Sequence, residues 1–221
     1  MTVRAALFDL DGTLVDSLED LTTAVNHMLA GFGRPSLTPA SVRGLVGKGA
    51  RNLVRRALAS DSEEAIARGL ALFVAYNSAH VADKSALYPG MGEALRQLAG
   101  DGIRLAVISN KPESLCHLIM EALGIALHFE FICGGDTFPE MKPSPLPLVR
   151  TLERLGISAG DAVMVGDSIN DIEAGQRAGI TTIGCTWGYG GPEELTGADC
   201  RAASPGDVAT MLLKEPRSFK K

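Results

Sequence analysis

Three aspartates, Asp9, Asp11 and Asp16, lie within the ten-residue stretch FDLDGTLVDS at residues 8–17. An apolar segment comes directly before this stretch, so the acids are expected to follow the end of a strand. Two carboxylates about 4 Å apart repel each other by roughly 4 kcal/mol at the effective dielectric of a protein surface. A cation must therefore separate them, and carboxylate oxygens favour a hard cation such as Mg²⁺. Asp16 is expected to have a structural role at the start of the next helix.

Other polar side chains follow the ends of later apolar segments. These residues are Ser109, Asn110, Lys142, Asp167, Ser168 and Asp171. In an open parallel sheet, ligands bind beyond the carboxyl ends of the strands, so these side chains are expected to share one edge. Carboxylates, a hydroxyl group and an ammonium group together at one edge indicate phosphoryl transfer.

Each of these groups has an expected role in that chemistry. Asp9 is predicted to be the nucleophile that attacks phosphorus, as carboxylates do in aspartyl-phosphate enzymes. Asp11 is predicted to protonate the leaving oxygen and later to accept a proton from the hydrolytic water. Gly12 allows a sharp turn that directs backbone N–H groups toward the phosphate. Ser109 and Lys142 are expected to hold phosphate oxygens, and Lys142 to offset the charge of the transition state.

The elements that must position these residues alternate along the chain. Strand-like segments are Val3–Leu10, Ile103–Ser109, Phe131–Gly134, Ala162–Gly166 and Thr181–Gly184. Apolar residues at helical spacing between them are Leu115, Leu118, Ile119 and Leu123, and then Leu148, Val149, Leu152 and Leu155. This alternation predicts an α/β fold with a Rossmann-like core, in which helices cover a parallel sheet.

One long segment breaks the alternation. No convincing strand pattern occurs from Asp16 to about Leu87, and two helical stripes occur instead. The stripes are Leu18, Leu21, Val25, Met28, Leu29 and Phe32, and then Ile66, Leu70, Phe73 and Val74. The pattern predicts an inserted α-helical cap domain at 16–87 between the two parts of the core, 1–15 and 88–221. The alternative is that these helices thicken one wall of a single domain.

Composition excludes several classes of partner. The 221 residues are 46% hydrophobic and 21% charged, with a formal net charge of −5. Nucleic acid and anionic membranes both require a basic surface, so neither is an expected partner. The four cysteines form no CxxC pair, which is typical of a reduced protein. No apolar stretch has the length of a signal peptide or a membrane span, so a cytoplasmic location is expected. The oligomeric state stays open.

Four motifs carry a family resemblance. The stretch DxDGTLVDS, the serine after the second strand, the Lys-Pro lysine and the sequence GDSxxD together resemble the haloacid dehalogenase superfamily in its phosphatase branch. The match covers roughly residues 4–15 and 88–200. The resemblance implies a metal held by the carboxylate of Asp9, the main-chain carbonyl of Asp11 and Asp167. It also implies that Asp171 supports Lys142 or a metal-bound water, and that a helical cap closes over the site.

Some supporting residues keep alternative interpretations. Gly12, Thr13, Ser168 and Asp171 are expected to support the site. Aspartates at strand-to-helix junctions commonly cap helices, but four of them beside Lys142 and Ser109 strain that explanation. Ser168 either caps the following helix or contacts substrate, and Asn110 either satisfies loop amides or binds substrate.

The cap sequence resembles a subgroup of phosphatases that hydrolyse 2-phosphoglycolate. The resemblance rests on the segments at 45–54 and 187–190. Gly47 and Lys48 belong to a Gly-Lys-Gly turn before a helix, where free N–H groups and a cation could receive the second negative group of a small substrate. The alternative is a simple turn with Lys48 and Arg51 in solvent.

These observations predict a Mg²⁺-dependent phosphomonoester hydrolase for a small phosphorylated metabolite. The expected reaction converts 2-phosphoglycolate to glycolate and phosphate through phospho-Asp9. A sugar-phosphate mutase of the same superfamily is one alternative, because it also uses the DxD motif and a cap. A phosphorylated receiver-type signalling domain is another, but the second acid, the helical insert and the length of the chain all disfavour it.

Overall fold

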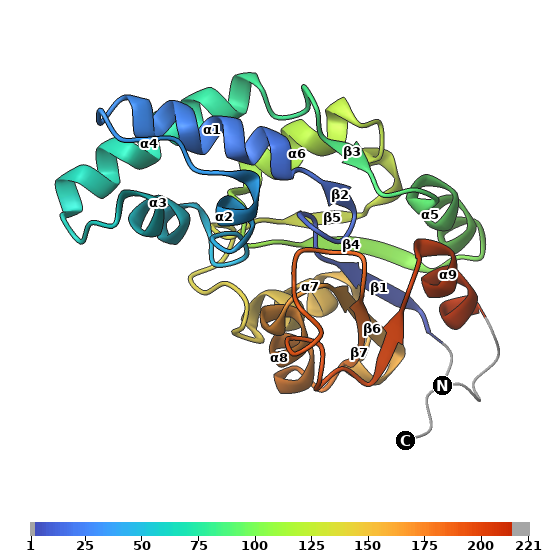
Figure 1. The fold of residues 1–221 in the computed structure, drawn as a ribbon. Helices are drawn as coiled ribbons and strands as arrows, with labels where there is room; N and C mark the ends of the chain where they lie inside the picture. Colours follow the sequence, from blue (N-terminus) through green and yellow to red (C-terminus); the bar gives the residue numbers. More distant parts are fainter. Residues whose placement is uncertain (1–2, 214–221) are drawn as a thin grey trace.

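A six-stranded parallel sheet forms the centre of the protein in a computed structural model that describes residues 3–213 (Figure 1). The strands are β1 (Ala5–Phe8), β4 (Arg104–Ile108), β5 (Phe131–Cys133), β6 (Ala162–Gly166), β7 (Thr181–Cys185) and β8 (Cys200–Ala202). Their order is β5-β4-β1-β6-β7-β8, and every neighbouring pair is parallel. The predicted α/β core is therefore confirmed, while residues 1, 2 and 214–221 of its expected range lie outside the described residues. The short strand β8 was not predicted, because three residues are too few to show a pattern.

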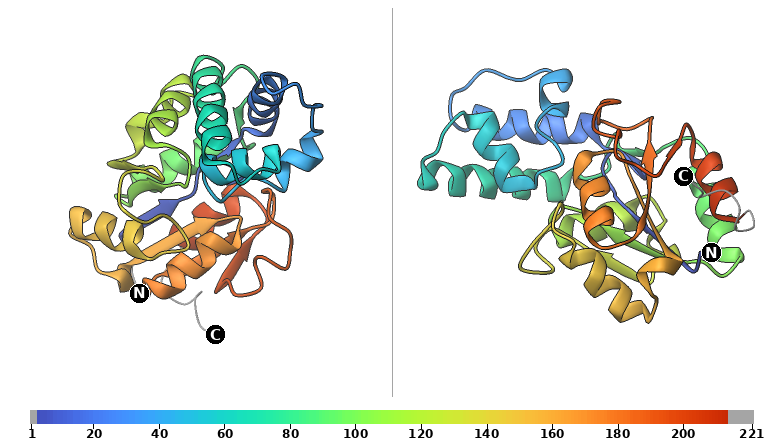
Figure 2. Two further views of the ribbon diagram at one scale, coloured as in Figure 1. Left: turned by 90° about the vertical axis from the view of Figure 1, so that its left-hand side faces the viewer. Right: turned by 90° about the horizontal axis from the view of Figure 1, so that it is seen from below.

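Helices cover both faces of the sheet (Figure 2). On one side are α5 (Met91–Gly100), α6 (Glu113–Ala122) and α9 (Pro205–Leu213), and on the other are α7 (Leu146–Leu155) and α8 (Ile169–Arg177). Strand β1 shows why both faces of the sheet are apolar, because successive side chains point to opposite faces. Phe8 packs on the side of α5, α6 and α9, and Leu7 packs on the side of α7 and α8. Two short 3₁₀ turns lie at Ala126–His128 and Ala159–Asp161.

Two predicted helix faces are too wide. Leu118 and Val149 were assigned to the buried stripes of their helices, but they are 38% and 37% exposed. Their neighbours Ile119 and Leu148 are fully buried. Each helix contacts the sheet along a stripe narrower than the apolar pattern, so a residue at the margin of the stripe remains in solvent.

The inserted segment forms a separate helical layer, the cap. It contains α1 (Leu18–Ala30), α2 (Pro39–Arg43), α3 (Ala50–Leu58) and α4 (Glu63–Ala79). Both predicted stripes are confirmed as helices, α1 and α4. Val25, Met28, Leu53 and Phe73 belong to a hydrophobic cluster distinct from the two clusters beside the sheet. Among residues 3–213, no helix combines the length and the apolar character that a membrane span requires.

A small two-stranded sheet connects the cap to the core. Strand β2 (Val15–Asp16) pairs antiparallel with β3 (Ala86–Leu87), so that Asp16 faces Ala86. Neither strand was predicted, because two residues carry no periodicity. The pairing places the two crossings between core and cap side by side. The exact boundaries at residues 16 and 87 stay a prediction.

Candidate active site

The polar residues expected at the strand ends meet at one edge of the sheet, facing the cap. Asp9 directly follows β1, Ser109 follows β4 and Asp167 follows β6. Strand β1 lies between β4 and β6 with Phe8 in register with Val107 and Val165, so Asp9 is level with the last residues of those strands and Ser109 and Asp167 follow one position beyond it. All three side chains are buried. The pattern of the sheet therefore produces a cluster of reactive groups from segments far apart in sequence.

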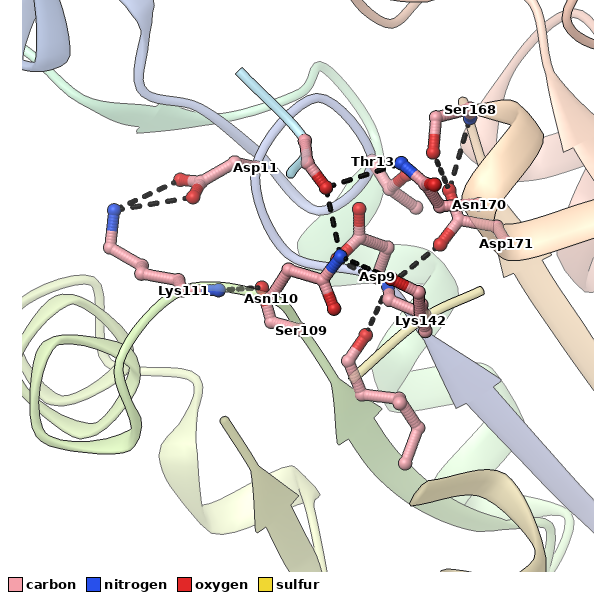
Figure 3. A network of polar contacts seen from close by, with 12 residues as sticks. Asp9, Asp11, Thr13, Ser109, Asn110, Lys111, Lys142, Ser168, Asn170 and Asp171 are labelled. Atoms are coloured by element: carbon pink, nitrogen blue, oxygen red, sulfur yellow. Dashed lines mark hydrogen bonds and ion pairs between the residues drawn. The ribbon is translucent and has the colours of Figure 1, made fainter. Parts of the chain in front are cut away.

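Lys142 provides a fixed cation beside Asp9 (Figure 3). Its Nζ lies 2.8 Å from Asp9 Oδ1 and 2.6 Å from Asp171 Oδ1, and it also donates to the carbonyl of Ile108. The Lys142 side chain is only 1% exposed. Burial by itself lowers the pKa of Lys142, but the carboxylates of Asp171 and Asp9 outweigh burial and raise it. Lys142 thus stays charged and binds one oxygen of Asp9, which leaves Asp9 Oδ2 for another partner.

Asp167 is held rigidly by the core. Its Oδ1 accepts a hydrogen bond from Thr13 Oγ1 at 2.9 Å, and its Oδ2 accepts from the backbone N–H groups of Tyr189 at 2.7 Å and Gly190 at 3.2 Å. Gly12 lies against the same carboxylate with a φ of +89°. A Cβ at Gly12 would lie 2.5 Å from Asp167 Oδ2. Only glycine fits this turn, and the predicted supporting residues Gly12 and Thr13 both lie at the site.

The carboxylate cluster fits a divalent cation. One oxygen from each of Asp9, Asp167 and Asp171 lies within 4.8 Å of the others, and all three residues are buried. Burial raises the pKa of Asp9 to about 7 against the opposing charge of Lys142, and it raises the pKa of Asp167 to about 6. Neighbouring carboxylates add to both shifts. Three buried carboxylates beside one ammonium group carry more negative charge than Lys142 neutralises, so hard oxygen donors are available for a metal ion.

Asp171 is the least available of the three carboxylates. Its Oδ1 contacts Lys142, and its Oδ2 accepts from the backbone N–H of Ser168 at 3.0 Å and from Ser168 Oγ at 2.7 Å. Lys142 neutralises the charge of Asp171, whereas the groups that donate hydrogen bonds to Asp167 are all uncharged. This arrangement leaves Asp9 and Asp167 as the side chains suited to a metal, with Asp171 orienting Lys142. The main-chain carbonyl of Asp11 as a further ligand stays a prediction.

Asp11 points away from Asp9 and toward Lys111 (Figure 3). Both of its carboxylate oxygens lie 3.2 Å from Lys111 Nζ, and Ser17 Oγ donates to Oδ1. Sequence analysis assigned no role to Lys111 or Ser17. A signal for Lys111 was present, because it directly follows Ser109 and Asn110 at the end of a predicted strand.

The cap contacts the site through the backbone of Gly47. Its carbonyl accepts hydrogen bonds from Asn110 Nδ2 at 2.8 Å and Asn170 Nδ2 at 3.2 Å. Asn110 Nδ2 also donates to the carbonyl of Lys142 at 2.8 Å. The side chain of Lys48 is exposed and borders a hollow beside α3 that adjoins the site and also contacts Asn110 and Pro112. The structure therefore brings Gly47 to the predicted site but leaves Lys48 outside it.

A loop at 187–191 contacts the cap, strand β2 of the two-stranded sheet and the carboxylates. Ser17 N donates to Tyr189 Oη at 2.7 Å, and Tyr189 Oη donates to Asp16 Oδ1 at 3.1 Å. From the cap, Arg43 donates to the carbonyls of Tyr189 at 2.9 Å and Gly188 at 2.8 Å. These contacts give Asp16 the structural setting expected for it. Apart from Asp16, sequence reasoning assigned these residues no part in the site.

A small cavity of about 40 Å³ lies between core and cap at this cluster. Its polar wall includes Asp9, Asp11, Ser109 and Lys142, together with Asn110, Lys111, Ser168 and Asn170. Leu21 and Phe73 from the cap and Leu115 from the core form part of its apolar wall. The cavity suits a small anionic group, and Asp9 and Asp11 also border an adjoining hollow of about 390 Å³ that Arg43 and Tyr189 line.

The fold and this site define the class of the protein. Residues 6–185 match the family model of haloacid dehalogenase-like hydrolases, and the chain belongs to this family. The resemblance inferred from the four sequence motifs is thereby confirmed.

Individual relatives have names that are more specific than the family name. The chain is 44% identical over 193 residues to "Phosphoglycolate phosphatase 1" of Pseudomonas aeruginosa, covering 84% of this chain and 70% of the relative. It is 40% identical over 216 residues to a phosphoglycolate phosphatase of Chromobacterium violaceum, and the match covers 95% of this chain and 96% of the relative. A crystal structure from Haemophilus somnus, described as a predicted phosphoglycolate phosphatase, superposes with a TM-score of 0.90 at 32% identity. The superposition covers 96% of this chain and 98% of the other.

Proposed function

We propose that this protein is a Mg²⁺-dependent phosphomonoester hydrolase that converts 2-phosphoglycolate to glycolate and phosphate. The observation that carries the proposal is the environment of Asp9, whose Oδ1 binds Lys142 at 2.8 Å while its carboxylate lies beside Asp167. Membership of the hydrolase family and the names of the relatives support both the reaction class and the substrate.

The reaction begins when Asp9 Oδ2 attacks phosphorus. A new bond forms between Asp9 and phosphorus, the ester P–O bond breaks, and Asp11 donates a proton to the leaving oxygen. Water then attacks phospho-Asp9 at phosphorus and gives its proton to Asp11, while the bond from phosphorus to Asp9 breaks. Ser109 and Lys142 hold phosphoryl oxygens during both steps, and Lys142 offsets their charge.

The metal and the cap complete the proposal. Asp9 and Asp167 would hold Mg²⁺, which would supply positive charge beside the phosphoryl oxygens. We propose residues 16–87 as the cap unit, with the hydrogen bonds to Gly47 positioning it over the site. The apolar side chains of the cap exclude bulk water from the reacting phosphorus.

The alternatives differ in measurable ways. A mutase returns the phosphoryl group to a sugar, and a receiver domain is phosphorylated without turnover. Asp11, the second acid, supports repeated turnover, because a receiver has no need of a group that protonates a leaving oxygen.

A panel of small phosphate esters tests the proposal. We expect phosphate release with 2-phosphoglycolate as the preferred substrate, loss of release in EDTA, and its return with added Mg²⁺. Assays should include sugar phosphates, with detection of isomerised sugar phosphate as well as free phosphate. Isomerisation without phosphate release would support the mutase, and no turnover of any ester would refute hydrolysis.

The carboxylate cluster also predicts how Mg²⁺ stabilises the protein. Asp9 and Asp167 have pKa values raised to about 7 and about 6, so in EDTA the folded state holds protons that the unfolded state has lost. The contribution of this cluster to the free energy of unfolding must then fall as pH rises from about 4 to about 7. Mg²⁺ binds the ionised carboxylates, so it should raise the melting temperature more at about pH 7.5 than at about pH 5.

Thermal melts at the two pH values, each in EDTA and in Mg²⁺, measure this effect without any assay of activity. The Asp167→Asn variant is the control and should lose most of the Mg²⁺-dependent shift. An equal shift at both pH values, or an unchanged shift in the variant, would contradict the assignment of Asp167 as a ligand.

A further inference from the structure

Lys111 is a buried cation that the proposed chemistry does not use. Its side chain is 5% exposed, and its Nζ lies 3.2 Å from each carboxylate oxygen of Asp11. It lines the same cavity as Asp9 and Lys142. Among the described residues that line this cavity, the cationic side chains are Lys111 and Lys142. Within residues 3–213, Lys142 is fixed between two carboxylates, whereas the one ion-pair partner of Lys111 is Asp11.

The pair of Asp11 and Lys111 cannot persist unchanged through the proposed reaction. Asp11 points toward Lys111 and away from Asp9, where the phosphorus must lie (Figure 3). To protonate the leaving oxygen, the Asp11 carboxyl group must turn toward that atom. Lys111 then loses its partner in a buried position, and a buried ammonium group without a partner is strongly destabilised. A second anion is needed beside Lys111 at that moment.

A carboxylate on the leaving group satisfies this need. In a phosphorylated 2-hydroxy acid, the carboxylate carbon is two bonds from the leaving oxygen, so it lies next to the place where Asp11 acts. Because Asp11 is proposed to protonate the leaving oxygen, the leaving group must lie near Asp11, and Lys111 lies beside Asp11 in the wall of the same cavity. Leu115 and Phe73 line the same cavity, whose volume of about 40 Å³ favours a short leaving group.

We propose that Lys111 binds the carboxylate of the leaving group and thereby selects short O-phosphorylated 2-hydroxycarboxylic acids. This inference rests on the proposed function and names the residue that sets its substrate class. Lys48, the cation indicated by the sequence, is exposed and borders the adjoining hollow, and it is the alternative residue for binding this carboxylate.

The test compares two esters that have the same two-carbon leaving-group skeleton, 2-phosphoglycolate and ethyl phosphate. The readout is selectivity, defined as kcat/KM for 2-phosphoglycolate divided by kcat/KM for ethyl phosphate. Because a charge-assisted contact is lost, Lys111→Met should lower selectivity by about 30-fold. Lys48→Met should change it by less than about 2-fold, as expected for an exposed charge.

The ratio separates recognition from structural effects. If Lys111 only orients Asp11, both esters lose rate equally and selectivity is unchanged, which would overturn the inference. A fall in selectivity in Lys48→Met alone would also overturn it. Lys111→Gln provides a second, polar variant if Lys111→Met does not fold, with the same expected loss of selectivity.

The wild-type assay distinguishes an incorrect role for Lys111 from an incorrect proposed function. A wild-type enzyme that hydrolyses ethyl phosphate and other esters without preferring 2-phosphoglycolate would overturn the role of Lys111 while hydrolysis stands. A wild-type enzyme that releases phosphate from no ester would overturn both.

Discussion

Replacing Asp9 with asparagine is expected to lower kcat by about 10⁵-fold, because removal of a nucleophile eliminates the covalent route. The amide has nearly the same shape as the carboxylate but does not form the acyl-phosphate bond. Ser109, Lys142 and Asp167 remain in place, so binding of substrate should weaken far less than turnover. The measurements are phosphate release at saturating substrate, and trapping of radiolabelled phosphoenzyme by acid quench in the wild type and the variant.

Loss of folding would not explain this result. Burial raises the pKa of Asp9 to about 7, so its charge is unfavourable in the folded protein without a metal. The Asp9→Asn variant removes that charge and should melt at the same or a higher temperature than the wild type in EDTA at about pH 7.5. A variant that retains turnover and still yields labelled protein would show that another residue is the nucleophile.

Replacing Lys142 with methionine is expected to damage both stability and catalysis. The substitution leaves Asp9 and Asp171 buried beside each other without the cation that contacts both, at 2.8 and 2.6 Å. Removing one member of a buried charge cluster typically costs about 3–5 kcal/mol of unfolding free energy. Because the charge that faces the phosphoryl oxygens is also lost, kcat should fall by about 10³-fold.

Urea unfolding at about pH 7.5, with phosphate release assayed in parallel, measures the two effects of Lys142→Met. The double variant Lys142→Met with Asp171→Asn should recover part of the stability, because one unpaired carboxylate is removed, but none of the activity. Lys84→Met is the matched control, since Lys84 is an exposed lysine paired with Glu19 and should contribute less than about 1 kcal/mol. A Lys142→Met protein as stable as the wild type would contradict the buried ion cluster.

The sequence predicted those parts of the site in which a polar residue directly follows an apolar strand. Asp9, Ser109 and Asp167 each follow a short apolar strand, and parallel strands bring their carboxyl ends to one edge. Spacing alone was therefore enough to bring these residues together. The family resemblance added the expectation that Lys142 and Asp171 act together, and the structure places their charged groups 2.6 Å apart.

Other parts depend on contacts that no local pattern encodes. Asp11 meets Lys111 across 100 positions of the chain, and Tyr189 meets Ser17 across 172. Their partners are chosen by how the cap and the loop at 187–191 pack, which a one-dimensional pattern does not specify. The role of Lys48 stays a prediction, because a turn rich in glycine predicts accessible N–H groups but not the direction of the side chain within it.

The contact between Gly47 and the two asparagines has an evolutionary consequence. The core holds the cap loop by a peptide oxygen, an atom that every amino acid possesses, while the φ of +100° keeps glycine at this one position. Residues 46 and 48 can therefore be substituted without loss of the hydrogen bonds from Asn110 and Asn170 to the Gly47 carbonyl. A lineage carrying this scaffold is free to acquire new substrates by altering the loop's side chains, while the fit between its two halves is inherited intact.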